Sequence, residues 1–286
     1  MSICIVGCGY LGERVASKIS LAGIETHALT RQPVRAESFE KRGWHSHLGD
    51  WLQPDSLRDL PQVDTLLIAV THRAVEGIPA EQTHTLGLAH LIDKLPGPLP
   101  RIVYISTTGV YSQDDGAWVN EESPCQPSRP GGIAALGAEQ WLFQHCGPAG
   151  VTVLRMAGLY GPDRIPNAER TRLKALANSH LDSYLNLIHI EDAVGYCVEA
   201  LQKKHSQFCY LVADGTPIAR SEYYRFLLEF LEIPPDESVS APATASPPRR
   251  AESNKRVDAA RLRRDFAYAC RYTDFREGIR ASCQKP

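Results

Sequence analysis

The sequence predicts an α/β protein built on a doubly wound parallel sheet, with a smaller C-terminal region. Through residues 1–157, short apolar runs alternate with helix-length stretches. This alternation is typical of parallel strands covered by helices on both faces. The runs are apolar at most positions, as expected for strands buried on both faces. The first run also leads directly into a pattern of three closely spaced glycines.

Five apolar runs in the first part of the chain are expected to be strands of this sheet. They are ICIVG (3–7), ETHALT (25–30), TLLIAV (65–70), RIVYIS (101–106) and VTVLRM (151–156). Stretches between them have the length and apolar spacing of helices. Examples are YLGERVASKISLAG (10–23), PAEQTHTLGLAHLIDKL (79–95) and AALGAEQWLFQHC (134–146).

The regular alternation fades after Met156, and a second, smaller region is expected over residues 158–286. Within it, a strand and helix at about 189–214 are expected to return to the first region, residues 1–157, so that the two parts interleave. SEYYRFLLEFLEI (221–233) predicts a strong helix with Ser221 as N-cap. The Pro-rich stretch from Pro234 to Pro248 predicts a long loop that covers the cleft between the regions or serves as a linker. Two short helical patterns close the chain.

Composition excludes several classes of function. The net charge of −2 gives no basic field for a nucleic acid or an acidic membrane. The N-terminus lacks the pattern of a secretory signal, and no apolar run approaches the ~20 residues that span a bilayer. Eight Cys without a CxxC pair and ten His without an HxxxH or HExxH grouping predict reduced thiols and no metal site. We therefore expect a cytoplasmic protein with neither a nucleic acid nor a membrane as partner.

The glycine pattern predicts a dinucleotide site. Gly7, Gly9 and Gly12 have GxGxxG spacing between the first strand and the first helix. In this motif the first glycine allows a tight turn, the second admits the pyrophosphate, and the third lets helix and strand pack closely. The helix N-terminus then offers free N–H groups to the phosphates. Tyr10 and Leu11, inside the pattern, are placed with the cofactor; the alternative is a glycine turn without a ligand.

Residues at the ends of further strands are also placed with the cofactor, and those after ETHALT (25–30) bear on which dinucleotide is bound. No acidic residue ends the second strand to hold the ribose of NAD; Thr30 and Arg31 stand there and Arg35 follows. Because arginine matches phosphate, this favours NADP, although NAD and a solvated role for the arginines stay open. Asp50, in HLGDWLQPDSL (47–57), follows a further expected strand that lies between ETHALT and TLLIAV, and it is expected to hold the adenine amino group or to cap the next helix. Ala69, near the end of the run TLLIAV (65–70), is also placed with the cofactor.

Four longer segments carry a family resemblance over nearly the whole chain. RIVYISTTGVYSQDDGAWVNEESPCQPS (101–128) resembles the fifth strand and following loop of the extended short-chain dehydrogenases/reductases, which include nucleotide-sugar epimerases, dehydratases and reductases. VLRMAGLYGPDR (153–164), LNLIHIEDAV (185–194) and the tail SNKRVDAARLRRDFAYACRYTDFREGI (253–279) resemble later parts of the same family. The resemblance implies a Rossmann fold and a small polar substrate such as a nucleotide sugar.

The resemblance also implies a catalytic hydroxyl, tyrosine and lysine. The hydroxyl lies four residues before the tyrosine of the VY pair, which places it at Thr107, with Ser106 and Thr108 as alternatives. It is expected to hydrogen-bond the reacting carbonyl or hydroxyl of the substrate. Tyr111, the tyrosine of the VY pair, is a weak second candidate for a catalytic role, its alternative being to pack below the site.

The tyrosine and lysine of the family's YxxxK motif are missing. When AEQWL is aligned through Glu139, the lysine position is Ala135 and the tyrosine position is Gly131. No tyrosine of the sequence has a lysine four residues later. Loss of general acid–base help typically costs ~10² to 10⁴ in rate, so ordinary redox or epimerase chemistry is in doubt. The chain resembles the atypical subgroup, which keeps the nucleotide fold and often lacks the active-site residues.

Four side chains are considered as substitutes for the missing pair. Tyr111 and Tyr160 follow the fifth and sixth strands, and His189 and Asp192 could reach the same cleft. Three of them have a stated structural alternative: packing below the site for Tyr111, and tying the loop to the helix start for His189 and Asp192, with Asp192 as a helix cap.

Three functional hypotheses follow. The chain is a dinucleotide-binding protein with altered or lost catalysis, an active NADP-dependent oxidoreductase or epimerase with a substitute acid, or a scaffold without nucleotide. The helix AALGAEQWLFQHC is of the kind that often builds dimers in the family, so a homodimer is left open.

Overall fold

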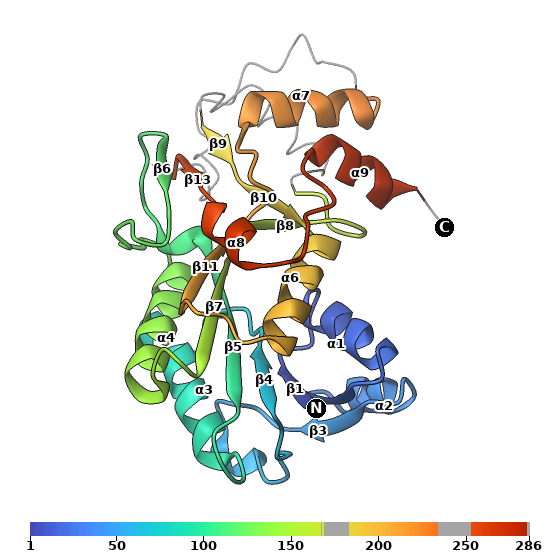
Figure 1. Ribbon diagram of the computed structural model, residues 1–286, viewed down its shortest axis with the longest axis vertical. Helices are drawn as coiled ribbons and strands as arrows, with labels where there is room; N and C mark the ends of the chain where they lie inside the picture. Colours follow the sequence, from blue (N-terminus) through green and yellow to red (C-terminus); the bar gives the residue numbers. More distant parts are fainter. Residues whose placement is uncertain (167, 169–182, 234–252, 285–286) are drawn as a thin grey trace.

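The computed structural model describes residues 1–166, 168, 183–233 and 253–284 (Figure 1). At its centre stands a seven-stranded sheet in the order β11-β7-β5-β4-β1-β2-β3, in which every neighbouring pair runs parallel. The strands are β1 (Ser2–Val6), β2 (Glu25–Thr30), β3 (His45–Leu48), β4 (Thr65–Ile68), β5 (Arg101–Thr107), β7 (Val151–Met156) and β11 (Cys209–Val212). The order reverses direction between β1 and β4, as in a doubly wound sheet, where ligands bind beyond the carboxyl ends of the strands.

Helices cover both faces of the sheet (Figure 1). One face carries α3 (Ala80–Lys94) and α4 (Pro130–Cys146), which pack on each other. The other face carries α1 (Gly12–Leu21) and α6 (Ile190–Gln202), while α2 (Pro33–Glu40) packs against β2 and β3. The predicted fold class, a doubly wound parallel sheet, is confirmed.

Two apolar layers hold the helices on the sheet. One layer lies under α3 and α4 and includes Leu66, Leu88 and Leu142, all fully buried. The layer under α1 and α6 includes Val15 and Leu201 and extends to the C-terminal segments. Continuous apolar strands such as TLLI (65–68) therefore fill both layers at once, because successive side chains point to opposite faces.

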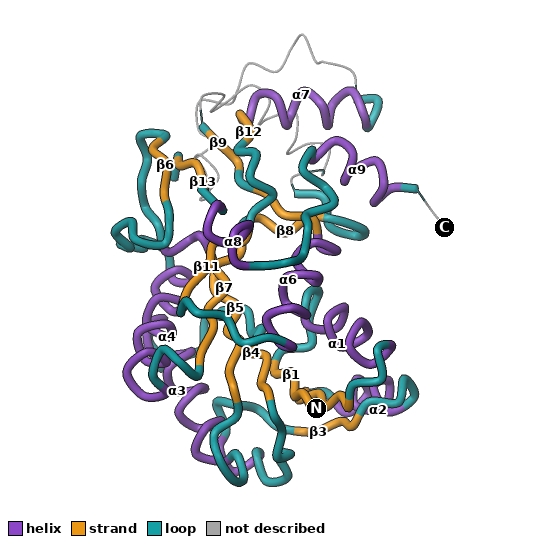
Figure 2. Tube along the Cα trace, in the orientation of Figure 1, coloured by secondary structure: helices purple, strands orange, loops and turns teal. Residues whose placement is uncertain are grey.

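The remaining elements gather beyond the carboxyl ends of the central strands (Figure 2). Three small two-stranded sheets join distant segments: β8 (Gly158–Tyr160) with β10 (Leu187–His189), β9 (Tyr184–Leu185) with β12 (Ile218–Ala219), and β6 (Ala117–Val119) with β13 (Lys255–Val257). The helices here are α7 (Arg220–Phe230), α8 (Ala260–Asp265) and α9 (Phe275–Cys283). Of the short 3-10 helices, η1 (Pro54–Ser56) lies between β3 and β4, and η2 (Thr108–Val110) directly follows β5. The Pro-rich stretch 234–248 lies outside the described residues.

The expected cap of α7 was wrong. The helix begins at Arg220, Ala219 is its N-cap, and no side chain caps it by a hydrogen bond. The reason is that the preceding strand β12 ends at Ala219, where it pairs with Tyr184. Because the strand runs straight into the helix, Ser221 lies inside the first turn.

Candidate functional site

The glycine-rich turn connects β1 to α1, and its three glycines meet different demands. Gly7 has a left-handed backbone with φ 96°, and a Cβ there would lie 2.6 Å from the Ala69 carbonyl group. A Cβ on Gly12 would lie 2.3 Å from the Gly7 carbonyl oxygen. Gly9 differs, because no atom lies within 4 Å of the place where its Cβ would be. The fold itself therefore requires glycine at 7 and 12, whereas position 9 faces open space.

Ala69, directly after β4, packs against this turn. Its N–H donates to the Val6 carbonyl oxygen at 2.8 Å, and its own carbonyl lies against Gly7. The end of β4 thus packs directly on the first glycine and fixes the path of the turn.

Tyr10 and Leu11 lie in different surroundings. The Tyr10 hydroxyl donates to the Pro162 carbonyl oxygen at 2.8 Å, and the Arg14 guanidinium lies over its ring, 4.1 Å from the centroid. Tyr10 therefore ties the glycine-rich turn to the loop after β8. Leu11 is 6% exposed and belongs to the apolar layer under α1, so its side chain packs rather than faces a ligand.

Arg31 and Asp50 lie together after β2 and β3. Arg31 Nη1 is 3.4 Å from Asp50 Oδ2, and the Arg31 side chain is 57% exposed. Asp50 Oδ1 accepts a hydrogen bond from the Leu52 N–H at 3.0 Å, so this carboxylate closes a turn and does not cap a helix. Arg35 is held instead by Glu13 at 2.7 Å and by the Cys8 carbonyl oxygen. Of Arg31 and Arg35, Arg31 is therefore the one whose side chain extends into solvent.

The exit of β5 places its hydroxyl groups differently. Thr107 Oγ1 accepts a hydrogen bond from the Gly109 N–H at 3.0 Å and caps η2. Ser106 is 6% exposed and donates to Glu139. Thr108 is the first residue of η2. Of these three, Ser106 is buried and bonded to Glu139, whereas Thr107 is only partly buried.

A buried ionic network joins the middle of α4 to β7. Arg155, on β7, contacts both carboxylate oxygens of Glu139, with Nη2 2.6 Å from Oε2. Arg155 Nη1 also donates to the Tyr111 hydroxyl at 2.5 Å, and that hydroxyl donates to the Asn120 carbonyl oxygen at 2.8 Å. Tyr111 is 2% exposed, and burial raises the pKa of its hydroxyl. The structure thus places Tyr111 in the packing under the site.

Tyr160, His189 and Asp192 are buried among the C-terminal segments. The Tyr160 ring lies edge-on to the His189 ring, with centroids 5.1 Å apart. His189 is the N-cap of α6, since its Nδ1 accepts the Glu191 N–H, and its Nε2 lies 3.1 Å from the Ser282 hydroxyl. The Asp192 carboxylate accepts the Tyr268 hydroxyl and the N–H groups of Arg271 and Tyr272. The expectation that Asp192 caps the helix was therefore wrong: His189 already caps it, and Asp192 holds the C-terminal tail.

Lys255 was not singled out from the sequence. It is 6% exposed, and its Nζ donates to the Tyr111 carbonyl oxygen at 3.0 Å and to the Ser253 hydroxyl at 3.2 Å. Burial and the nearby charges of Arg129 and Arg220 lower the pKa of its ammonium group to about 8. The sequence contains one indication of Lys255, its position in the tail that resembles the family, but there it is one of several basic residues and nothing distinguishes it.

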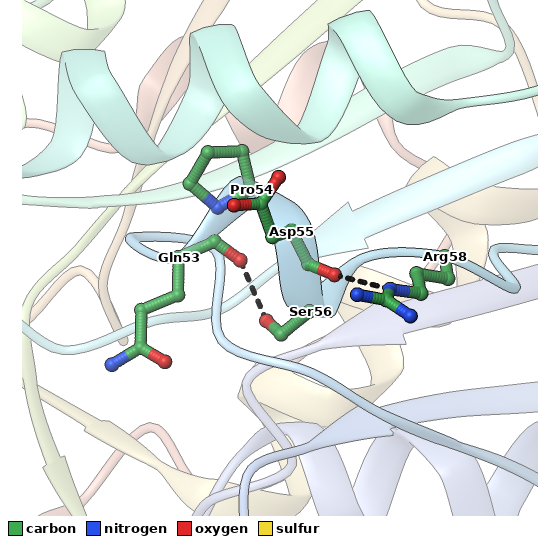
Figure 3. A pocket seen from close by; sticks show the side chains of 5 residues that line it. All are labelled: Gln53, Pro54, Asp55, Ser56 and Arg58. Carbon is green, nitrogen blue, oxygen red and sulfur yellow. Dashed lines mark hydrogen bonds between the residues drawn. The ribbon is translucent and has the colours of Figure 1, made fainter.

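A surface hollow lies in the connection between β3 and β4 (Figure 3). It is lined by Gln53, Pro54, Asp55, Ser56 and Arg58. The Ser56 hydroxyl donates to the Gln53 carbonyl oxygen at 2.6 Å, and Arg58 Nε donates to the Asp55 carbonyl oxygen at 2.8 Å. These polar groups are held by their own loop, and the lining includes none of the predicted site residues.

Within the described ranges, neither a metal site nor a membrane-spanning helix is found. No group of three or more His, Cys, Asp or Glu side chains could hold a metal ion there. In the same part of the chain, every helix is too short or too polar to cross a membrane.

Comparison with known proteins decides the family. The model of the NAD dependent epimerase/dehydratase family matches residues 3–210, more than half of the chain. The chain belongs to this family. The resemblance noted in the sequence is thereby confirmed.

Individual relatives are similar over almost their full length. Protein YeeZ of Escherichia coli (strain K12) is 26% identical over 277 residues, which cover 95% of this chain and 96% of the relative. UDP-glucose 4-epimerase from Thermotoga maritima has a similar structure, with a TM-score of 0.78 at 17% identity over 99% of this chain and 97% of that one. MoeE5, solved with UDP-glucose and NAD, has a TM-score of 0.71 at 19% identity over 99% and 97% of the two chains. At these identities the two structures show a shared fold.

The two positions at which the resemblance places the tyrosine and the lysine, 131 and 135, are occupied by small residues. Gly131 lies in the first turn of α4, where a Cβ would meet the Cβ of His72 at an ordinary 3.9 Å. Ala135 lies one turn on and is 4% exposed. A different glycine, Gly132, is required by packing, because its Cβ would lie 2.4 Å from the Gly109 carbonyl oxygen. The fold itself therefore does not demand a glycine at position 131.

Proposed function

We propose that the chain binds a nicotinamide dinucleotide on the glycine-rich turn and lacks the tyrosine–lysine proton transfer of its family. Bound in this way, the dinucleotide serves as a ligand that the protein senses or presents. The family supports binding of this cofactor class, and MoeE5, a protein of the same fold, was solved with NAD. The loss of turnover rests on Gly131 and Ala135.

The observation that carries the binding proposal is the open space at Gly9. Internal packing explains Gly7 and Gly12, but it gives no reason for the missing side chain at Gly9. A pyrophosphate that approaches the backbone does give one. The N-terminus of α1, which begins at Gly12, adds free N–H groups and a positive partial charge at this place.

We propose NADP as the preferred cofactor because of Arg31. Its side chain is exposed, and its partner Asp50 at 3.4 Å leaves the guanidinium in a weak contact. A 2′-phosphate would replace this contact with a bidentate one. Arg35 contributes less, because Glu13 already holds it at 2.7 Å.

Each group of the chain then has a defined part in holding the cofactor. The glycine-rich turn holds the pyrophosphate, and Arg31 the 2′-phosphate. When bound, the dinucleotide supplies a hydride acceptor or donor. Thr107, partly buried at the end of β5, is the hydroxyl that would contact a reacting group. Proton transfer by a tyrosine whose pKa is lowered by a lysine has no counterpart at positions 131 and 135.

An alternative is an active NADP-dependent oxidoreductase or epimerase on a nucleotide-sugar-like substrate. The observation that favours it is Lys255, since a buried lysine beside other cations is a common way to obtain an acid–base group near neutral pH. A homodimer and a cytoplasmic location stay predictions from the sequence.

The test is a cofactor titration followed by a turnover assay. Wild type is expected to bind NADPH more tightly than NADH, and Arg31→Gln is expected to remove most of that difference while NADH binding persists. With UDP-glucose or other sugar nucleotides, wild type is expected to leave bound NADP⁺ unreduced, and Gly131→Tyr/Ala135→Lys to reduce it. Steady reduction by wild type would support the alternative and contradict the loss of catalysis.

A further inference from the structure

The loop that follows β8, residues 161–164, is held against the glycine-rich turn by Tyr10. The Tyr10 hydroxyl donates to the Pro162 carbonyl oxygen at 2.8 Å. A Cβ at Gly161 would lie 3.0 Å from that hydroxyl, so a side chain at this position would crowd the tyrosine. Because Tyr10 directly follows Gly9 in the chain, the 161–164 loop approaches the turn on which the dinucleotide is proposed to lie.

Hydrogen bonds within the 161–164 loop fix its course. The Gly161 N–H donates to the Arg164 carbonyl oxygen at 3.1 Å, and the Arg164 N–H donates to the Gly161 carbonyl oxygen at 3.0 Å. Between them, Asp163 adopts a left-handed backbone with φ 63°, a conformation that aspartate accepts more readily than most residues. The Arg164 side chain therefore starts from a defined position next to Tyr10.

Two arginines from distant parts of the chain meet at the Tyr10 ring. The Arg14 guanidinium carbon lies 4.1 Å from the ring centroid, and that of Arg164 lies 5.3 Å from the same centroid. Arg14 comes from the first turn of α1, whereas Arg164 belongs to the 161–164 loop. Two positive charges are thus held around one aromatic ring beside the glycine-rich turn.

The positive charge at this ring is only weakly balanced. Within the described part of the chain, Asp163 is the one acidic side chain that pairs with either arginine: its Oδ2 lies 4.0 Å from Arg14 Nη2, and the side chain is 93% exposed. Such an exposed ion pair contributes little. Arg14 Nη1 also donates to the Tyr10 carbonyl oxygen at 3.0 Å, a neutral acceptor. Arg164 is exposed and contacts the Tyr10 ring, which leaves its N–H groups available to an anion.

We propose that Arg164, assisted by Arg14, contacts the pyrophosphate of the dinucleotide that the glycine-rich turn binds. A pyrophosphate is negatively charged, and the planar guanidinium group matches phosphate oxygens with two parallel hydrogen bonds. The inference rests on the proposed function, because the anion belongs to the dinucleotide. It adds that a loop of the C-terminal region, residues 158–286, takes part in cofactor binding.

The test is calorimetric titration of the full chain with NADPH and with NADH. Both dinucleotides carry the pyrophosphate, so Arg164→Gln is expected to weaken both about 10-fold and to leave the ratio of the two affinities as in wild type. Arg31→Gln, in contrast, is expected to change that ratio. The NADH titration is repeated as the salt concentration rises from about 0.05 M to about 0.5 M, because salt screens exposed charges. Affinity for NADH is expected to fall less in Arg164→Gln than in wild type, a difference that a merely structural role would not produce.

Three further variants separate charge from structure. Arg164→Lys keeps the charge without the planar fork and is expected to lie between wild type and Arg164→Gln. Arg14→Gln is expected to act in the same direction but more weakly, because its guanidinium is shared with the Tyr10 carbonyl oxygen. Lys18→Gln removes an exposed charge from the last turn of the same helix α1 and is the matched control, with wild-type affinities expected.

Equal NADH affinity in wild type and Arg164→Gln, or the same salt dependence in both, would contradict the inference. Equal weakening by Lys18→Gln would also contradict it, since any nearby charge would then serve. Failure of the proposed function gives a different result: wild type would bind neither dinucleotide. If wild type binds both and Arg164→Gln binds them equally well, the inference fails and the proposed function stands.

Discussion

Gly12 packs directly on Gly7: a Cβ at Gly12 would lie 2.3 Å from the Gly7 carbonyl oxygen. This contact sets the distance between the first helix and the first strand, and it is made by backbone alone. The same turn contains Gly9, beside which there is open space. The GxGxxG pattern thus combines two glycines that internal packing requires, Gly7 and Gly12, with Gly9, for which packing gives no reason.

Alanine substitutions are expected to separate these roles. Gly12→Ala forces Cβ into the backbone and is expected to lower the free energy of unfolding by about 2 kcal/mol or more. Gly9→Ala meets no neighbour, and its φ lies outside the left-handed region, so a change within about 0.5 kcal/mol is expected. Urea unfolding measures both. Equal destabilisation by the two variants would contradict the distinction.

The Glu139–Arg155 pair is expected to be strongly coupled, because the two side chains are only 3% and 8% exposed. Arg155→Met leaves a carboxylate buried without its partner and is expected to cost about 3–5 kcal/mol, whereas Glu139→Leu/Arg155→Met is expected to recover much of that loss. The control is Lys203→Met, which removes a 58% exposed lysine from its pair with Glu199 and leaves that carboxylate bonded to the N–H groups of Ala267 and Tyr268, so it is expected to cost less than about 1 kcal/mol. Additive losses in the double variant, read from thermal unfolding, would contradict the coupling.

His27 and His47 predict a loss of stability in mild acid. Their ring nitrogens lie 3.0 Å apart at the edge formed by β2 and β3, and burial lowers the pKa of both; the Glu25 carboxylate opposes the shift at His27 without reversing it. A lowered pKa means that the unfolded chain takes up protons first. The contribution to stability is therefore present above the unfolded value of about 6.5 and is lost as the pH falls through the folded values.

His47→Gln is expected to flatten this decline when the free energy of unfolding is measured from pH 7.5 to pH 5. His145→Gln, at the exposed end of α4, serves as the control and is expected to keep the wild-type slope. A slope unchanged by His47→Gln would show that the histidine pair has no part in it.

Asp214 predicts the opposite dependence. Burial raises the pKa of its carboxyl to about 7, with further contributions from Asp192 and Asp274. Because the folded state holds this proton longer, the contribution to stability is present below the unfolded value of about 3.9 and is lost as the pH rises through 7. Asp214→Asn keeps the oxygen that accepts the Thr216 N–H and is expected to stabilise the protein at pH 8 by on the order of 3 kcal/mol. Near pH 4 the variant and wild type are expected to be alike; destabilisation at pH 8 would contradict the argument.

Local patterns were sufficient to predict most of the central sheet. Strands such as β4 and β7 are buried on both sides, so most of their consecutive residues are apolar and the sequence predicts them. The third strand, HSHL (45–48), lies at the sheet edge and carries one exposed and one half-buried histidine, so no apolar run predicts it. Its place was inferred only from the series around it.

The parts that the sequence did not reveal depend on pairing between distant segments. Lys255 acquires its surroundings because β13 pairs with β6, more than a hundred residues earlier, and no local pattern specifies such a partner. The same holds for Asp192, whose carboxylate accepts hydrogen bonds from the N–H groups of Arg271 and Tyr272 in the tail and does not cap its own helix. By contrast, the glycine-rich turn was readable, because its requirements are met within one strand, one turn and one helix.

Titration of the protein with NADPH, followed by nicotinamide fluorescence, tests the central claim most directly. Wild type is expected to bind, and Gly9→Val, whose Cβ meets no neighbour within 4 Å, is expected to unfold like wild type and yet to lose NADPH affinity. Undiminished NADPH affinity in a folded Gly9→Val protein would show that the dinucleotide does not lie on this turn.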